Sequence, residues 1–268
     1  MLFPERERVI YDKNPLESVV CQLRFPSILK IDSELPSRFQ DRIRAEYPQF
    51  KQRPLLAAGF NLTPELSKLV GESFLPMGGG QQAYDFSSED SHWQVSLTRE
   101  FVALTAKKYR RWEEFKGRLA SVRAAFEAEY TPSSYSRIGL RYQDVIRRSE
   151  LNLKDVEWAE LLEQHIAGEL GAPNIAGAIQ VAKRELLINL ENGQGHVRIK
   201  HGLAFASETA EVCYMIDADF YTDQKMELPH ATARLDHFNV EAARLFKWCI
   251  RERLHTAMGP QVIPPSRV

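Results

Sequence analysis

The amino-acid sequence predicts an α+β protein in which long helices pack on one face of an antiparallel sheet. Large apolar residues recur at steps of three or four between positions 112 and 130, which is the pattern of one buried helix face. Runs at 93–106 and 136–146, on either side of that helix, alternate apolar and polar residues as half-buried strands do. Each half of the chain repeats strands followed by a long helix, so we expect either two units, 1–150 and 151–268, or one continuous domain.

The helix at 112–130 is the element around which we expect the rest to be organised. One stripe of it carries six large apolar residues, Trp112, Phe115, Leu119, Val122, Phe126 and Tyr130. Thr131-Pro132 ends the helix, because proline lacks a backbone donor and disfavours helix in the residue before it. Gly117, inside the helix, costs about 1 kcal/mol relative to alanine, and it either marks a close contact or is simply tolerated.

The chain before residue 50 reads as one strand and one helix. Residues 16–25 alternate between apolar and polar side chains, and Pro26 ends that strand. Ser33 is the expected N-cap of a helix that continues to Tyr47 and closes at Pro48.

The stretch 51–82 is the least regular part of the sequence. We predict a short helix over 64–70 and a strand over 82–86. Glycines 78–80 lack the lysine or helix start of a phosphate loop, so we interpret them as an ordinary loop or hairpin. Arg99-Glu100 divides the next apolar run, which is either a hairpin or one bent strand.

The second half continues with the same two kinds of pattern. Helical spacing predicts helices over 156–170 and 235–258. Alternation predicts strands over 178–189, 196–205 and 211–221.

Composition narrows the class of protein. With 44% hydrophobic residues among 268, the chain can bury a sizeable core, and its net charge of −1 gives no overall electrostatic case for nucleic acid or anionic lipid. The three cysteines are far apart, which argues against a disulfide framework or zinc knuckle and favours free buried thiols. The N-terminus does not resemble a signal peptide, and no apolar run approaches the ~20 residues that span a bilayer. We therefore expect a cytoplasmic protein with no membrane partner.

The strongest candidate for a binding surface is basic and aromatic. Its residues are Lys107, Lys108, Tyr109, Arg111, Arg137 and Arg141. The first four lie at a strand-to-helix junction, and the last two share one face of a strand. If the strands are neighbours, guanidinium groups and helix N-terminal amides could converge on an anion, and the aromatic ring could stack on a base. The alternative is a solvated surface in which sheet arginines pair with carboxylates.

A second, weaker candidate is a pair of carboxylates. Asp217 and Asp219 alternate onto the same strand face, roughly 7 Å apart, where they could hold a divalent metal or act as acid and base. His196 and His201, one strand away, are expected on opposite faces. Because no further ligand spacing supports a metal, salt-bridging carboxylates are the alternative interpretation. No cofactor motif is present, so we expect none.

Several short motifs recur in an order that resembles a known group. They include Gln22-Leu23-Arg24-Phe25-Pro26, Tyr109-Arg110-Arg111-Trp112, Arg137-Ile138-Gly139-Leu140-Arg141-Tyr142 and Asp217-Ala218-Asp219-Phe220. Together they resemble a sporadically distributed family of uncharacterised bacterial proteins of roughly this length, over nearly the whole chain. The resemblance implies a bacterial cytosolic protein from a patchily inherited gene, as in mobile or defence-associated loci. It implies no known activity and no catalytic residues.

Three hypotheses about function follow. The one we favour is a non-enzymatic binding or accessory protein of a mobile or defence-associated bacterial locus, which recognises a macromolecular partner. The partner is expected to be another protein or a second copy of this chain, with nucleic acid left open. The alternatives are a metal-dependent hydrolase or nuclease that uses Asp217 and Asp219, and a structural subunit of an obligate complex.

Overall fold

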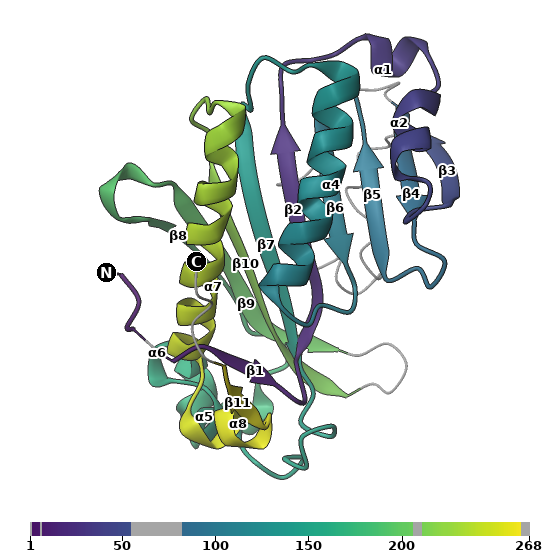
Figure 1. Ribbon diagram of the computed structural model, residues 1–268. Coiled ribbons are helices and arrows are strands. Elements are labelled where there is room, and N and C mark those ends of the chain that lie inside the picture. Colours follow the sequence, from purple (N-terminus) through teal and green to yellow (C-terminus); the bar gives the residue numbers. More distant parts are fainter. Residues whose placement is uncertain (1, 6, 55–81, 206–210, 264–268) are drawn as a thin grey trace.

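A nine-stranded antiparallel sheet forms the centre of the molecule (Figure 1). The computed structural model describes residues 2–5, 7–54, 82–205 and 211–263. The strand order is β3-β4-β5-β6-β2-β7-β10-β9-β8. The strands are β2 (Leu16–Arg24), β3 (Gln49–Pro54), β4 (Gln82–Ser87), β5 (Trp93–Leu97), β6 (Phe101–Ala106), β7 (Arg137–Ile146), β8 (Lys183–Asn189), β9 (His196–Phe205) and β10 (Val212–Thr222). The predicted α+β fold is confirmed.

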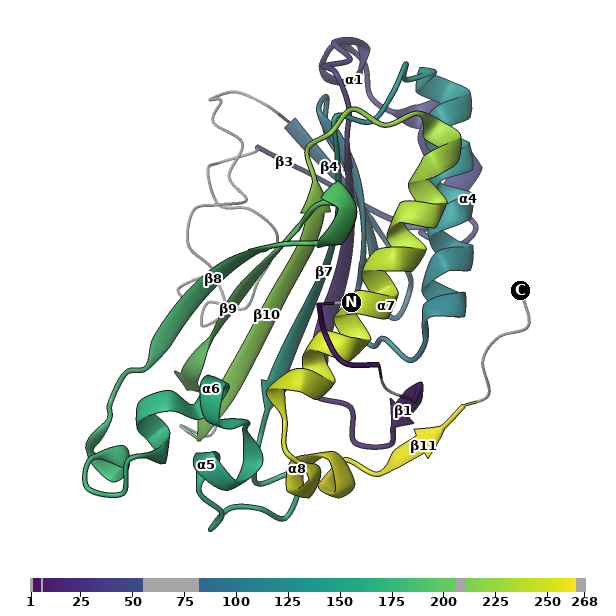
Figure 2. The same cartoon turned by 90° about the vertical axis from the view of Figure 1, so that its left-hand side faces the viewer.

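Two long helices cover one face of this sheet side by side (Figure 2). They are α4 (Trp112–Tyr130) and α7 (Ala231–Cys249), and α2 (Ser37–Ile43) packs beside α4. Shorter elements complete the chain: α1 (Lys30–Ser33), α5 (Trp158–Leu161), α6 (Gln164–Ala167), α8 (Glu252–Ala257), and the 3-10 turns η1 (Gly168–Gly171), η2 (Ala176–Ala178), η3 (Glu191–Gly193) and η4 (Leu228–His230). Strands β1 (Val9–Tyr11) and β11 (Pro260–Val262) pair separately and bring the two ends of the chain together.

The helix α4 has the bounds that its apolar spacing predicts, and all six stripe residues are buried. Its last turn closes where Thr131 adopts a left-handed conformation and donates its N–H to the carbonyl of Glu127. The stripe meets the sheet through contacts such as Phe126 against Phe25, with ring centroids 4.5 Å apart. Apolar side chains from both halves of the chain, including Phe238 of α7, belong to the same core.

One sheet runs through both units that the sequence suggests. Strand β7 pairs with β2 on one side and with β10 on the other, so pairing continues across residue 150. The hairpin interpretation at Arg99-Glu100 is also confirmed, since Thr98 donates its N–H to the carbonyl of Phe101 and β5 pairs with β6.

The predicted helices over 156–170 and 235–258 are wrong as continuous elements. Both are interrupted by the same tertiary contact, an antiparallel bridge between Leu162 and Ile250. The two residues are extended, and the bridge is flanked by backbone hydrogen bonds from Glu163 to Cys249 and from Arg251 to Leu161. These bonds replace helical ones, and α5 and α6 form in place of the first helix, α7 and α8 in place of the second.

The helix predicted from Ser33 to Pro48 is also corrected. Ser33 ends α1 and caps nothing, and α2 begins after Pro36, because a proline lacks the N–H and restrains the residue before it. Strand β3 was not predicted, since its side chains are mostly exposed and show no alternation of apolar and polar residues. Strand β8 begins at Lys183, five residues later than expected.

Two sequence predictions, the helix over 64–70 and the loop at glycines 78–80, lie outside the described residues. Among the residues that are described, no helix combines the length and the apolar character needed to cross a bilayer.

Two glycines allow a matched test of this fold. A Cβ at Gly117 would meet no described atom within 4 Å, so the helix contact considered above is absent and Gly117→Ala should raise the free energy of unfolding by about 1 kcal/mol. Gly202 has φ +153°, and a Cβ there would lie 1.9 Å from the carbonyl oxygen of Ala182. Gly202→Ala should therefore destabilise the protein. Chemical denaturation of both variants measures their free energies of unfolding. Equal denaturation midpoints for the two variants would contradict the prediction.

Candidate functional site

The face of the sheet opposite α4 and α7 carries charged side chains that pair across strands. Because Tyr142 of β7 faces α7, alternation puts Arg137 and Arg141 on this other face. Arg141 donates from Nε and Nη2 to the two oxygens of Asp217, each at 2.6 Å, and both side chains are 4% exposed. Arg137 pairs with Asp219 at 2.8 Å. The basic and acidic candidates predicted from the sequence thus neutralise one another.

Arg137 reaches Asp219 by lying across a glycine. The residue directly opposite Asp219 in the β7–β10 register is Arg141, so Arg137 has to extend along the sheet. A Cβ at Gly139 would lie 2.4 Å from Nη1 of Arg137, and the missing side chain leaves the path open. The guanidinium also lies 4.7 Å from the ring centroid of Tyr221. Gly139 therefore leaves room for the Arg137 side chain, and the ring of Tyr221 packs against its guanidinium group.

The two predicted metal-binding carboxylates share a face, as alternation predicts, but each is held by an arginine. Burial raises the pKa of Asp219, and the neighbouring Arg137 and Arg141 oppose that rise. Across residues 2–5, 7–54, 82–205 and 211–263, no group of three or more histidine, cysteine, aspartate or glutamate side chains is placed to hold a metal ion.

The two histidines lie on opposite faces of β9, as expected. His196 stacks against Tyr221 on the charged face. His201 lies on the helical face, is buried, and has Nδ1 2.7 Å from the hydroxyl of Tyr214. That hydroxyl donates to the carbonyl of Ile166, so Nδ1 of His201 carries the proton and donates to the hydroxyl oxygen. Burial, together with the nearby charges of Arg184 and His165, lowers the pKa of His201 to about 4.

The remaining predicted residues lie at the other end of the strands from Arg137. Strand β6 runs antiparallel to β2, with Ala106 beside Val19 and Phe101 beside Arg24, whereas Arg24 pairs with Arg137. The six residue steps from Phe101 to Lys107 place the start of the 107–111 segment roughly 20 Å from Arg137 along the sheet.

The members of that segment do not share one environment. Lys107, Lys108 and Arg111 are exposed. Tyr109 packs between Phe115 and Tyr142, and burial raises its pKa. The six predicted residues therefore do not form one surface.

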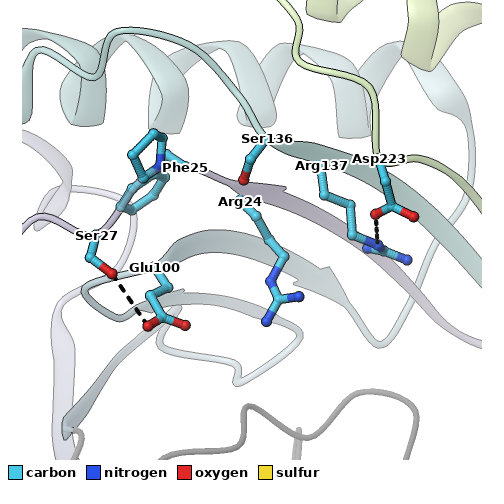
Figure 3. Close-up of a pocket in the computed structure, with 8 residues that line it drawn as sticks. Arg24, Phe25, Ser27, Glu100, Ser136, Arg137 and Asp223 are labelled. Carbon is cyan, nitrogen blue, oxygen red and sulfur yellow. Dashed lines mark hydrogen bonds and ion pairs between the residues drawn. The ribbon is translucent and has the colours of Figure 1, made fainter.

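A cleft of about 370 Å³ opens where β2 ends and β7 begins (Figure 3). It is lined by Arg24, Phe25, Pro26, Ser27, Glu100, Ser136, Arg137 and Asp223. Backbone hydrogen bonds fix its walls: Phe25 donates to the carbonyl of Glu100, and Ser136 donates to that of Arg24. Three segments that are far apart in sequence therefore meet in one rigid arrangement.

The charges in the cleft are unequally paired. Arg137 is held by Asp219 and lies 3.6 Å from Asp223. Glu100 accepts a hydrogen bond from Ser27. Arg24 has no hydrogen bond or ion pair from its side chain to any residue that the structure describes. Its strand neighbours are Arg137 on β7 and Phe101 on β6. Figure 3 shows its guanidinium group between Glu100 and Arg137.

Sequence reasoning did not select Arg24. In the sequence it is a polar residue of a predicted strand and part of the motif that ends in Phe25-Pro26, and neither feature gives it a role in binding. The available signal was that Arg24 lies at the end of a predicted strand, shortly before a proline that stops the pairing. The sequence does not show which residue lies opposite Arg24, because that depends on the strand order.

Comparison with known proteins adds no family assignment. No protein-family model matches the chain, and no curated protein matches it significantly in sequence.

The buried ion pair makes a strong prediction about stability. Arg141→Ala leaves the carboxylate of Asp217 buried without its bidentate partner, which should cost about 3–5 kcal/mol of unfolding free energy. Replacing both residues, as Arg141→Met with Asp217→Leu, should recover most of that loss because neither charge is then buried. Urea denaturation of the parent protein, Arg141→Ala and the double variant measures the free energy of unfolding of each. A single variant as stable as the parent would show that the pair is not structural.

His201 predicts a pH dependence of stability. Its pKa of about 4 in the folded protein lies below the ordinary value near 6.5, so the unfolded chain binds the proton first as the pH falls. The contribution of His201 to the free energy of unfolding is complete above pH ~6.5 and is lost as the pH falls toward ~4. Its size is about 1.4 kcal/mol for each unit by which the folded protein lowers the pKa. His201→Asn should flatten the fall in melting temperature over that window. Parallel profiles for the parent and His201→Asn would refute this.

Proposed function

We propose that this protein is a non-enzymatic binding module that recognises an anionic group of a macromolecular partner in the cleft at the end of β2 and β7. The observation that carries this proposal is the guanidinium of Arg24, which has no side-chain partner among the described residues, lines a cleft and lies opposite a second arginine. The other arginines in the described strands of this sheet are each paired with a carboxylate, as Arg141 is with Asp217.

The chemistry of the cleft favours a single carboxylate or phosphate group. Like charges directly across a strand pair destabilise a sheet, so an anion that contacts both Arg24 and Arg137 would relieve their repulsion. A guanidinium presents two parallel donors that match either anion. The hydroxyls of Ser27 and Ser136 supply further donors from the same walls.

Acidic groups in the same cleft limit what can bind. Glu100 and Asp223 line it beside the arginines, and the chain as a whole has a net charge of −1. A densely charged polyanion such as a nucleic-acid backbone would meet these carboxylates. An isolated anionic group on a protein partner meets the two arginines without that repulsion, and we therefore favour a protein partner.

The setting of this proposal follows from the resemblance noted in the sequence. A module of this kind would act as an accessory protein of a mobile or defence-associated bacterial locus, in the cytoplasm. Its three cysteines, Cys21, Cys213 and Cys249, are buried and free, which suits a reducing compartment.

Arg24→Ala tests the proposal with little risk to the fold, since Arg24 is partly exposed and holds no described partner. Titration with inorganic phosphate and with acetate, followed by NMR chemical shifts, should perturb Ser27 and Ser136 in the parent protein. The loss of charge-assisted hydrogen bonds worth about 1.5–3 kcal/mol should weaken binding roughly 10- to 100-fold in Arg24→Ala.

Arg38→Ala is the matched control. Arg38 is an exposed arginine of α2 outside the cleft, so its removal changes the net charge equally. It should bind as the parent protein does. Equal affinity of Arg24→Ala and the parent, or shifts confined to another surface, would overturn the proposed site.

A further inference from the structure

The outer edge of β8 is an open strand edge. Strand β8 ends the strand order, and no described strand pairs with it on the side away from β9. Figures 1 and 2 show it at the margin of the sheet, and Figure 2 shows it apart from α4 and α7. An open edge presents unpaired N–H and C=O groups, which readily pair with a strand of another chain.

The pairing with β9 shows which backbone groups point outward. Leu203 donates to the carbonyl of Ala182, and Leu190 donates to that of Gly195, so even-numbered residues of this strand bond to β9. In an antiparallel ladder the alternate residues point the other way. The outward-pointing residues are therefore Lys183, Glu185, Leu187 and Asn189.

The outer strand is apolar at its centre and lacks two of the features that usually protect an edge, a bulge and a proline. Leu187 is 56% exposed and Leu186 is 40% exposed, and Ile188 is half-buried. The register with β9 is continuous from Lys183 to Asn189, without a bulge, and the strand contains no proline. Its charges lie toward one end and leave three consecutive apolar side chains at the other.

We propose that β8 pairs antiparallel with β8 of a second copy of this chain, about a two-fold axis at Leu187. In this register Leu187 faces Leu187 of the second copy, and Leu186 faces Ile188. Glu185 then faces Asn189, whose amide can donate to the carboxylate. Apolar side chains meet apolar ones, and the outward backbone groups of both strands are satisfied.

Charge and polarity select this register over its neighbours. An axis at Glu185 would place that carboxylate against its own copy, and directly opposed like charges destabilise a strand pair. An axis at Leu186 would place Glu185 against Leu187. An axis between two residues would place outward-pointing residues opposite inward-pointing ones, which cannot exchange hydrogen bonds. The axis at Leu187 avoids these conflicts. The contact is self-complementary, as a two-fold dimer requires.

The dimer contact is separate from the cleft. Strands β7, β10 and β9 lie between β2 and β8, which places the two features roughly 19 Å apart across the sheet. The inference therefore stands independently of the proposed anion site, and its test does not depend on any ligand.

Light scattering during size-exclusion chromatography of the full chain is the first test. The parent protein should elute with twice the mass of the 30.8 kDa chain. Leu187→Glu places like charges at the axis and should yield the monomer mass with an unchanged circular dichroism spectrum, because this side chain is more than half exposed. The matched control is Val240→Glu, at an exposed position of α7, which should remain dimeric. A monomeric parent, or a dimeric Leu187→Glu variant, would overturn the proposal.

Cysteine cross-linking tests which residues of the two β8 strands face each other in the proposed dimer. Opposed residues that exchange hydrogen bonds have Cα atoms about 5.5 Å apart, within the range of a disulfide. Leu187→Cys should therefore form a covalent dimer on mild oxidation, and the three native cysteines are buried. Glu185→Cys should not, because its two copies would lie about four residues, or roughly 13 Å, apart. Cross-linking of Glu185→Cys in preference to Leu187→Cys would refute the axis at Leu187.

Discussion

The pairing of β7 with β2 on one side and β10 on the other is the interaction on which the rest of the structure depends. These three strands form the middle of the sheet and bring residues from both halves of the chain together. They also separate two sets of side chains: Ile138 and Leu140 face the helices, and Arg137 and Arg141 face the other way. A slip of one residue would exchange the two faces, so helix burial and ion pairing fix the same register.

Neutralisation within the sheet decides which charges remain available for binding. Arg141 lies where burial would make an unpaired charge costly, and Asp217 satisfies it with two hydrogen bonds. Arg24 lies where β2 ends and the cleft begins, so its guanidinium can stay hydrated without a partner. The density of charged residues in the sequence therefore indicates where the sheet is stabilised. Arg24 is the arginine of the described sheet strands that has no carboxylate partner, and the binding site we propose is built on it.

Both proposals concern places where pairing within the chain stops. The cleft lies at the end of β2 and β7, and the dimer contact lies at the outer edge of β8. A two-fold dimer would carry two clefts on one continuous sheet. A partner with two anionic groups at a suitable spacing would then bind more tightly than either cleft alone, because the second contact forms at a high effective concentration.

The sequence by itself determined those elements whose side-chain period agrees with their environment. The stripe of α4 and the strand β9 have the predicted bounds, and the hairpin between β5 and β6 forms at Arg99-Glu100. Asp217 and Asp219 share a face because alternation is a local property of a strand. The tertiary structure alone decided the rest. The bridge between Leu162 and Ile250 interrupts two helical patterns, since backbone groups can find partners far away in sequence. Strand order decides that Arg24 faces Arg137 and that Arg141 faces an acid, and no local pattern records which strand lies beside which.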